Sequence, residues 1–253
     1  MVTRRSVLKG IAVMPLGAVL ADPELAAAAA DSLQTVSITA ASGVKVSGSL
    51  AVPDNSPAGA VLLIHEWWGL NDQIKSVAAE LGKIGYLALA ADLYEQKVTT
   101  DPDTARQYMQ QVDSAVAAET LVAWGEWLRS HPQGNGKVAT IGWCFGGGWS
   151  LNASLSMPVD ATIIYYGNVQ KNAADTAILK GSVLGHFATQ DQWINAEMVE
   201  GFEQALEASG KTFTHYWYDA QHGFANPTTA HYDADDAATA WSRTLDFLAE
   251  HIA

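Results

Sequence analysis

The hydrophobic positions of the chain alternate between short continuous apolar runs and longer stretches with helical spacing. Ala60 to Ile64 is a continuous run of the kind found in strands that are buried within a sheet. The apolar residues that follow recur at helical spacing from Ile74 to Ile84, and Gly85 ends this pattern just before another apolar run, Tyr86 to Ala90. This order of strand, helix and strand predicts a βαβ unit with parallel strands.

The same alternation continues to the C-terminus, and an antiparallel hairpin is predicted before it. Val36 to Ile38 and Val44 to Val52 flank the turn Ala41-Ser42-Gly43. Further strands are expected at Lys137–Gly142, Ala161–Tyr165, Val183–Phe187 and Thr212–Trp217, and helices at 101–130, at 146–155, from about Asn195, and along Ala237, Trp241, Leu245 and Leu248. No repeat, linker or break in composition divides the chain, so one domain is expected over residues 31–253. The expected fold class is α/β, a doubly wound, mostly parallel sheet with helices on both faces.

The N-terminus has the layout of an export signal. Arg4 and Arg5 lie in a short cationic segment, and the apolar run Ile11 to Leu20 follows it. This run is too short to span a bilayer, and Ala26 to Ala30 supply the small residues that a signal peptidase needs. We therefore expect residues 1–30 to be a twin-arginine-type signal peptide that is removed, and the mature protein to be periplasmic or secreted. The alternative is a helical N-terminal arm with incidental arginines.

Charge and cysteine content narrow the partners. The chain carries 14 Lys and Arg against 27 Asp and Glu, a net charge of −13, which repels nucleic acid and anionic membrane surfaces. We expect a monomer that acts on a small molecule, with no nucleic-acid partner and no stable membrane association. A single cysteine excludes an internal disulfide and a cysteine-rich zinc site, and the histidines lack the spacing of metal ligands. No metal or cofactor is expected.

That single cysteine lies in a sequence that is typical of a nucleophile elbow. The strand that ends at Ile141 continues into Gly142-Trp143-Cys144-Phe145-Gly146 and then into a helix, which matches the G-x-S-x-G turn with Cys in place of Ser. The residues two before and two after the nucleophile must be small, and both are glycine. The N-terminal end of the following helix favours a thiolate. The alternative is a small buried cysteine in a glycine-rich turn.

An acid and a base follow Cys144 in the order that such hydrolases use. Asp191 comes just after the predicted strand Val183–Phe187, and His222 follows the strand that ends near Tyr218. The predicted catalytic triad is therefore Cys144, Asp191 and His222. Taken separately, Asp191 could be a solvated carboxylate or a helix cap, and His222 could be a loop histidine that bonds to the backbone.

Taken together, five motifs resemble the dienelactone hydrolase family of the α/β-hydrolase superfamily, from about Val36 to the C-terminus. They are His65-Glu66-Trp67-Trp68-Gly69, Asp92-Leu93-Tyr94, Gly142-Trp143-Cys144-Phe145-Gly146-Gly147, Gly185-His186-Phe187 with Asp191, and His222-Gly223-Phe224. The resemblance implies that Cys144 is the nucleophile, His222 the base and Asp191 its orienting acid. It adds Glu66 as a carboxylate that contacts the thiol before substrate arrives.

The early loop with Glu66 has two expected functions. While charged, a carboxylate beside a thiol opposes thiolate formation, and it can also accept the thiol proton. The alternative is that Glu66 only caps the loop. The backbone N–H groups of Trp67 and Phe145 are expected to form the oxyanion hole, because one donor should come from this loop and one from the residue after the nucleophile.

The substrate pocket departs from the family pattern. In the dienelactone-cleaving members, arginines after Asp-Leu-Tyr and four residues past the catalytic His are thought to hold the substrate carboxylate. Here Gln96 and Asn226 stand at these positions, so a dianionic lactone would lose its bidentate partners. Aromatic residues on or beside the site loops indicate an apolar pocket for a neutral or weakly polar substrate, with core packing as the alternative. The expected substrate-binding residues are Trp68, Tyr94, Gln96, Trp143, Phe224 and Asn226.

These features predict a hydrolase that cleaves an ester, a lactone or a thioester through attack by the Cys144 thiolate. Two hypotheses from other classes stay open. An activated thiol could sense or scavenge oxidant, although the chain has no second cysteine to resolve a sulfenic acid. The chain could also be a non-catalytic binding protein on a hydrolase scaffold, because a fold does not establish a function.

Overall fold

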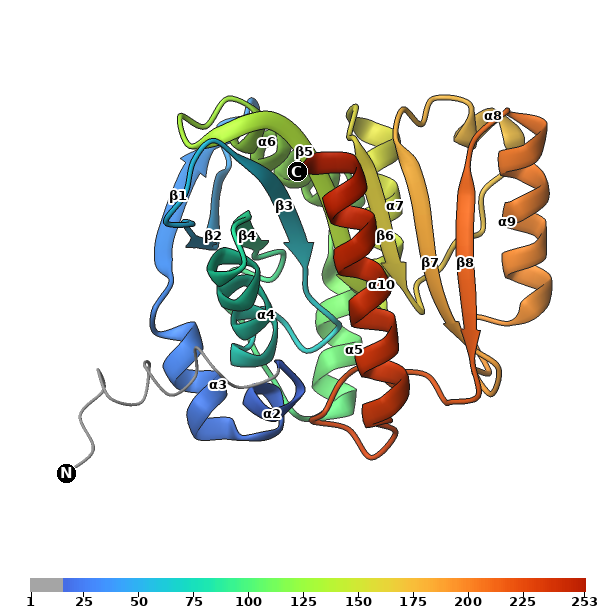
Figure 1. Ribbon diagram of the computed structural model, residues 1–253, viewed down its shortest axis with the longest axis horizontal. Coiled ribbons are helices and arrows are strands. Elements are labelled where there is room, and N and C mark those ends of the chain that lie inside the picture. Colours follow the sequence, from blue (N-terminus) through green and yellow to red (C-terminus); the bar gives the residue numbers. More distant parts are fainter. Residues whose placement is uncertain (1–15) are drawn as a thin grey trace.

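The computed structural model of the protein describes residues 16–253 and is built around one twisted sheet of eight strands (Figure 1). The strands follow the spatial order β1-β2-β4-β3-β5-β6-β7-β8. β1 pairs antiparallel with β2 and β2 with β4, and every other pairing is parallel. The strands are β1 (Gln34–Thr39), β2 (Lys45–Ala51), β3 (Ala58–Ile64), β4 (Leu87–Ala91), β5 (Gly134–Trp143), β6 (Ala161–Tyr165), β7 (Ser182–Ala188) and β8 (Phe213–Tyr218).

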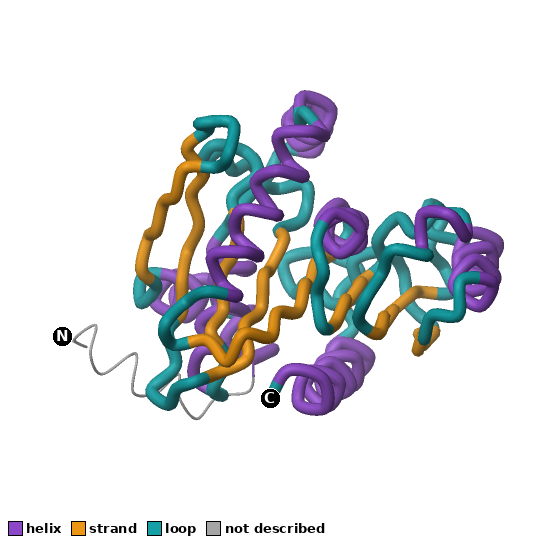
Figure 2. Tube along the Cα trace, turned by 90° about the horizontal axis from the view of Figure 1, so that it is seen from above, coloured by secondary structure: helices purple, strands orange, loops and turns teal. Residues whose placement is uncertain are grey.

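Helices cover both faces of this sheet, as Figure 2 shows from above. The apolar sides of α4 and α10 pack on one face, and those of α6, α7 and α9 pack on the other. The helices are α2 (Leu16–Ala21), α3 (Pro23–Ala30), α4 (Asp72–Lys83), α5 (Pro102–Gln111), α6 (Ser114–Arg129), α7 (Phe145–Ser156), α8 (Ala173–Thr176), α9 (Ala196–Ala208) and α10 (Ala234–Ile252). This arrangement confirms the predicted doubly wound, mostly parallel α/β sheet.

One predicted helix is two helices. Residues 101–130 show helical spacing throughout, but the helix is interrupted between α5 and α6 at Val112, whose backbone is extended. Asp113 then caps α6, because its carboxylate accepts hydrogen bonds from the N–H groups of Ala115 and Val116. The cap satisfies the free donors of a new helix start, so the second helix begins in a new direction even though the apolar spacing continues.

The N-terminal helices lie against the outer side of α4. Ala29 of α3 is buried beside Ala79 of α4, and the Ser76 hydroxyl donates a hydrogen bond to the Ala26 carbonyl. The arginine pair of the predicted export signal lies outside the described residues. Within residues 16–253, no helix is both long and apolar enough to cross a membrane.

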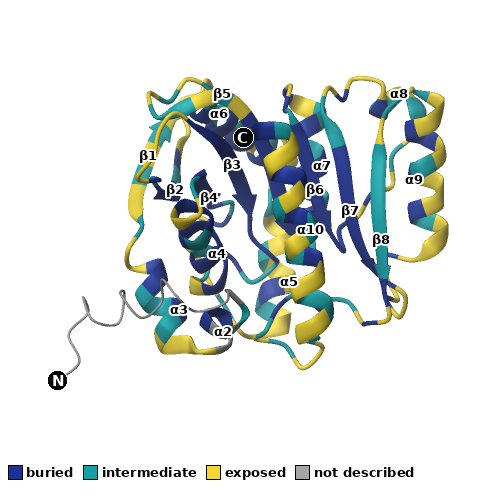
Figure 3. Ribbon diagram, in the orientation of Figure 1, coloured by how far each residue is buried: buried dark blue, intermediate teal, exposed yellow. Residues whose placement is uncertain are grey.

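The central strands are the most buried part of the molecule (Figure 3). Every residue of β3, β4 and β6 is buried, which agrees with their continuous apolar sequences. The carboxyl ends of parallel strands meet at one edge of a sheet, and the loops at that edge can place polar side chains around a ligand. The loops after β3, β5, β6, β7 and β8 therefore converge on a common place.

Candidate active site

A sharp turn between β5 and α7 presents Cys144 at this edge. Cys144 has a backbone φ of 55° and a ψ of −117°, outside the regions that residues other than glycine usually adopt. A Cβ at Gly142 would collide with the carbonyl of Gly146, and one at Gly146 would collide with the carbonyls of Ile64 and His65. The two glycines therefore allow the close approach of strand, turn and helix that holds the thiol in a partly exposed position.

His222 connects the thiol with a buried carboxylate. Its Nδ1 lies 2.6 Å from Oδ2 of Asp191, and its ring and Cys144 line one cavity, close enough for the thiol to raise the pKa of the ring. Because Nδ1 is used by Asp191, Nε2 is the ring nitrogen left for the thiol. The other oxygen of Asp191 accepts from the backbone N–H groups of Trp193 and Ile194, at 2.8 and 3.1 Å. The structure thus brings the three predicted triad residues together from three different loops.

The electrostatics of this chain of groups favour a charged imidazole. Burial lowers the pKa of His222, but the hydrogen bond with Asp191 and the hydrogen bond and charge of Cys144 outweigh it and raise this pKa to about 10. Burial raises the pKa of Asp191, yet the hydrogen bond and charge of His222 and the two backbone donors bring it below its ordinary value. Asp191 is therefore a carboxylate at neutral pH, and His222 can hold the proton of the thiol.

A second carboxylate, Glu66, lies beneath the triad and is only 4% exposed. Asn226 donates a side-chain hydrogen bond to Oε2 of Glu66, and the Tyr166 hydroxyl donates to Oε1 at 3.4 Å. Burial raises the pKa of Glu66 to about 7, and the Asn226 bond, the charge of His222 and the Tyr166 bond only partly oppose this rise. Glu66 can therefore gain or lose a proton near neutral pH.

The loop that carries Glu66 is fixed by a buried histidine. Nδ1 of His65 lies 2.6 Å from the carbonyl of Glu66, and Nε2 accepts a hydrogen bond from the Leu93 N–H at 3.1 Å. These contacts require a neutral ring with its proton on Nδ1. Burial lowers the pKa of His65, which keeps this tautomer neutral. His65 is thus a structural connection between the loops after β3 and β4.

Two backbone donors near Cys144 are available to a ligand. Phe145 is the first residue of α7, where a helix leaves its N–H groups without internal partners. Trp67 follows Glu66 in the adjoining loop, and within residues 16–253 neither its N–H nor that of Phe145 donates to a protein acceptor. This arrangement can stabilise negative charge on an oxygen held beside the thiol.

A largely apolar cavity of about 910 Å³ opens over Cys144, Glu66 and His222. Glu66 is the one carboxylate among the described residues that line it, and Arg106 and Lys171 add positive charge. Its aromatic walls are Trp67, Trp68, Phe145, Trp149, Tyr166 and Trp193. The described residues contain no cluster of three His, Cys, Asp or Glu side chains that could hold a metal ion.

Of the six expected substrate-binding residues, only Trp68 lines this cavity. Trp143 is the last residue of β5 and packs on Tyr165 at a ring distance of 5.4 Å, within the core beneath α4 and α10. Phe224 is fully buried in the same core. The side chain of Asn226 is buried against Glu66. Trp143 and Phe224 are therefore core residues and do not line the cavity, as the alternative of core packing predicted.

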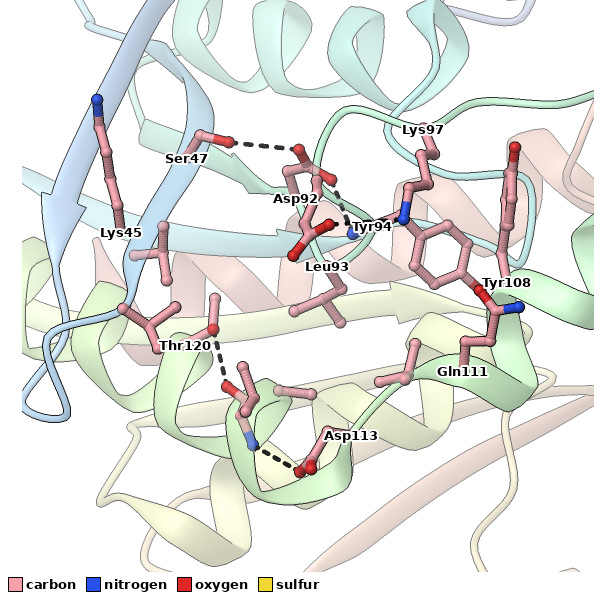
Figure 4. Close-up of a pocket in the computed structure, with 16 residues that line it drawn as sticks. Lys45, Ser47, Asp92, Leu93, Tyr94, Lys97, Tyr108, Gln111, Asp113 and Thr120 are labelled. Carbon is pink, nitrogen blue, oxygen red and sulfur yellow. Dashed lines mark hydrogen bonds and ion pairs between the residues drawn. The ribbon is translucent and has the colours of Figure 1, made fainter.

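The other two expected residues belong to the loop after β4. Gln96 is exposed and does not line the cavity. Tyr94 is directed into a separate cavity of about 310 Å³ between β2 and helices α5 and α6 (Figure 4). The carboxylate of Asp92 accepts hydrogen bonds from the backbone N–H groups of Tyr94 and Gln96 and thereby fixes the conformation of this loop. Tyr94 still packs against Phe145, with 5.6 Å between ring centres.

Sequence reasoning missed three aromatic residues of the cavity. Tyr166 follows β6 directly, so the strand-end rule that found Asp191 and His222 would also have found it. Trp149 lies on the second turn of α7, and Trp193 is two residues beyond Asp191. No sequence signal distinguishes these two tryptophans from core residues, because their exposure depends on the surrounding loops.

Comparison with known proteins identifies relatives of this chain. A sequence model of the dienelactone hydrolase family matches residues 46–252. A carboxymethylenebutenolidase of Pseudomonas putida is 28% identical over 224 residues, which cover 85% of this chain and 95% of that protein. The protein usf of Aquifex pyrophilus is 29% identical over 225 residues, with 83% and 95% covered.

Solved structures show the same fold. A dienelactone hydrolase-like promiscuous phosphotriesterase from metagenomic libraries has a TM-score of 0.79 at 24% identity, and the match covers 87% of this chain and 99% of that one. A thermophilic esterase of Thermogutta terrifontis has a TM-score of 0.65 at 16% identity, with 87% and 93% covered.

Proposed function

The chain belongs to the dienelactone hydrolase family of hydrolases, and on this basis we propose that it cleaves an ester or lactone with Cys144 as nucleophile, His222 as acid and base, and Asp191 as the orienting acid. The observation that supports this most is the position of His222, which bonds through Nδ1 to Asp191 and lines the same cavity as Cys144. A thioester substrate would react by the same steps.

The proposed reaction starts from a Cys144 thiolate and a His222 imidazolium, a pair that the raised pKa of His222 favours. The thiolate attacks the carbonyl carbon, and the electron pair that moves to oxygen is held by the N–H groups of Phe145 and Trp67. When the C–O bond breaks, His222 gives its proton to the leaving alcohol and a thioester remains. Water then attacks the thioester, His222 takes a proton from that water, the C–S bond breaks, and the thiolate and a carboxylic acid are released.

Glu66 has a proposed function in the resting enzyme. Its carboxylate is buried and its pKa is raised to about 7, so it gains a proton more readily than an ordinary glutamate. A neutral Glu66 does not oppose the thiolate, whereas a charged one favours the thiol by like-charge repulsion. We infer that the protonation of Glu66 regulates how much thiolate is present before substrate binds.

The proposed substrate is neutral or weakly polar. Its binding cavity has aromatic walls, and the two positions at which dienelactone-cleaving relatives are thought to carry arginine hold neutral side chains here. Gln96 is exposed outside the cavity, and the Asn226 amide already donates to Glu66. A dianionic lactone would therefore find no charged donor at these two positions.

The single cysteine makes the test direct, because iodoacetamide can alkylate no thiol except that of Cys144. The assay follows p-nitrophenol release from short-chain p-nitrophenyl esters, with dienelactone as a second substrate. We expect ester cleavage that iodoacetamide abolishes, little dienelactone turnover, and no activity in Cys144→Ala. Full activity in Cys144→Ala would contradict the scheme. Peroxide consumption without ester cleavage would favour the oxidant-sensing hypothesis, and saturable ligand binding with neither activity would favour the binding hypothesis.

We also propose that residues 1–30 direct export by the twin-arginine route. Their removal would take from the folded domain Leu20, which packs in the main apolar core, and most of the apolar residues of the small cluster around Ala79. The Ser76 hydroxyl would keep the Asp72 carbonyl as an acceptor, at 2.6 Å. In cell fractionation, the wild-type protein should be shortened and periplasmic, and the variant Arg4→Lys with Arg5→Lys should stay full-length in the cytoplasm. A full-length cytoplasmic wild type would contradict the proposal.

A further inference from the structure

Trp193 is unusually exposed for its residue type. Its side chain is 66% exposed, the highest value among the large apolar residues that the structure describes as exposed. Met109, which is 37% exposed, lines the same cavity. Exposed apolar surface that gathers at a cavity rather than scattering singly marks a binding site. Trp193 therefore has a surface that is available to a ligand in the cavity over Cys144.

The position of Trp193 is tied to the catalytic residues. Its backbone N–H donates to Asp191, the carboxylate that orients His222, at 2.8 Å. Its ring lies edge to face with the His222 ring, at 5.2 Å between centres and 82° between planes. A movement of the Asp191 turn would therefore move this indole as well. Trp193 therefore lies beside the base before any ligand binds.

This position indicates which half of a substrate Trp193 contacts. In the proposed reaction His222 gives its proton to the oxygen of the leaving alcohol, so this alcohol must lie beside the imidazole ring. Trp193 packs against that same ring and lines the cavity. The leaving group, rather than the acyl group, is thus the part of the substrate that comes next to the indole.

The size and walls of the cavity indicate the chemistry of that leaving group. A cavity of about 910 Å³ lies near the upper end of the roughly 300–1,000 Å³ range of ligand sites, so a short aliphatic ester would fill only part of it. Aromatic walls interact best with planar rings, because ring faces and edges carry opposite partial charges. A planar aromatic group uses both the volume and the walls.

We propose that Trp193 determines specificity by stacking against an aromatic ring in the leaving-group half of an ester, so that the enzyme prefers esters of aromatic alcohols. This inference rests on the proposed ester hydrolysis and goes beyond it by naming the substrate class and the residue that selects it. Contact between two aromatic rings stabilises binding by more than the buried area alone. This extra stabilisation corresponds to a roughly two- to tenfold preference for an aromatic over a non-aromatic ring of similar size.

The test compares esters that differ only in the planarity of the remote ring. Phenethyl acetate and cyclohexylethyl acetate have leaving alcohols of similar size and acidity, and their hydrolysis is followed in a pH-stat. We expect kcat/KM to be roughly two- to tenfold higher for the phenethyl ester in the wild type, this ratio to approach one in Trp193→Ala, and Trp193→Phe to keep most of it. Ile178→Ala is the matched control, because Ile178 is 53% exposed and lines none of the cavities described above.

Several outcomes would overturn the inference. The first is a wild-type kcat/KM ratio near one, and the second is an unchanged ratio in Trp193→Ala. The third is an equal loss of kcat/KM with both esters in Trp193→Ala, because that loss would mean that Trp193 only shields His222 from water. A preference seen only between ethyl hydrocinnamate and ethyl cyclohexanepropanoate would move the aromatic group to the acyl half and overturn the assignment. If Trp193→Ala does not fold, product inhibition of the wild type decides, because phenethyl alcohol should then inhibit at lower concentration than cyclohexylethanol. Failure of the proposed function would look different, since every ester would then resist hydrolysis or be cleaved despite iodoacetamide.

Discussion

The buried carboxyl group of Glu66 should make the stability of the protein depend on pH in a direction unusual for a glutamate. Burial raises its pKa to about 7, against 4.5 for an ordinary glutamate, and the bond from Asn226, the charge of His222 and the Tyr166 bond only partly compensate. Between these two pH values the folded protein holds a proton that the unfolded chain has released. The free energy of unfolding therefore falls as pH rises through this window.

The expected size of this effect follows from the same values. A difference of about two and a half pH units corresponds to about 3 kcal/mol of stability, which is present at pH 4.5 and lost by about pH 7 to 8. Glu66→Gln keeps the shape of the side chain and an oxygen for the Asn226 donor, but it cannot ionise. We expect the free energy of unfolding of this variant, relative to the wild type, to rise by about 3 kcal/mol between pH 4.5 and pH 8.

Urea unfolding followed by tryptophan fluorescence at several pH values measures this difference, with equal slopes required of both proteins. Glu95→Gln is the control for the loss of one negative charge, because its side chain is 88% exposed. A gap between Glu66→Gln and the wild type that stays constant over this pH range would refute the reasoning. Because a charged Glu66 favours the thiol, its ionisation should also slow the alkylation of Cys144 in the wild type, and this pH-dependent change should be absent in Glu66→Gln.

Three further predictions concern the elbow, the triad and the core. Gly146→Ala should lower the melting temperature and abolish esterase activity, because its Cβ would collide with the carbonyl of Ile64, whereas Gly201→Ala meets nothing within 4 Å and should be neutral or more stable by up to about 1 kcal/mol. Asp191→Asn should lower kcat by roughly 10³ to 10⁴ with little loss of fold, as measured by p-nitrophenol release. Burial and the charge of Arg243 lower the pKa of His186 to about 3, so stability should fall by about 5 kcal/mol as pH drops from 6.5 to 3; His186→Gln should reduce this loss in acid unfolding.

The sequence predicted the parts of the fold that depend on local patterns. Continuous apolar runs identify strands that are buried on both faces, and for this reason β3 and β6 were found within two residues of their observed ends. Helical spacing identifies helices but is insensitive to a change of direction, so α5 and α6 were predicted as one. The signal for the break was Asp113, which is an ordinary N-cap residue, but a cap within a periodic stretch has no pattern of its own.

The site could be predicted to the extent that loop position decides it. Cys144 was predicted from its glycine-flanked elbow motif, and Asp191 and His222 were predicted because each follows a strand and strand ends meet at one edge of a parallel sheet. The direction of a side chain within such a loop is set by tertiary packing, which the sequence does not show. Trp143 and Trp193 both lie within two residues of a triad member, yet Trp143 is 4% exposed and Trp193 is 66% exposed.

Asn226 connects the unusual ionisation of Glu66 with the substrate that the cavity can accept. Its Oδ1 accepts hydrogen bonds from the N–H and the hydroxyl of Thr228, at 2.9 and 2.7 Å, so its amide nitrogen must face Glu66. An arginine at this position would bring a full positive charge, which would lower the pKa of Glu66 and could also bind a substrate carboxylate. The amide supplies a donor without a charge and is buried away from the cavity. Burial therefore keeps the pKa of Glu66 near 7, because Asn226 opposes it with a hydrogen bond and not with a charge, and the same neutral side chain offers no charge to a substrate carboxylate.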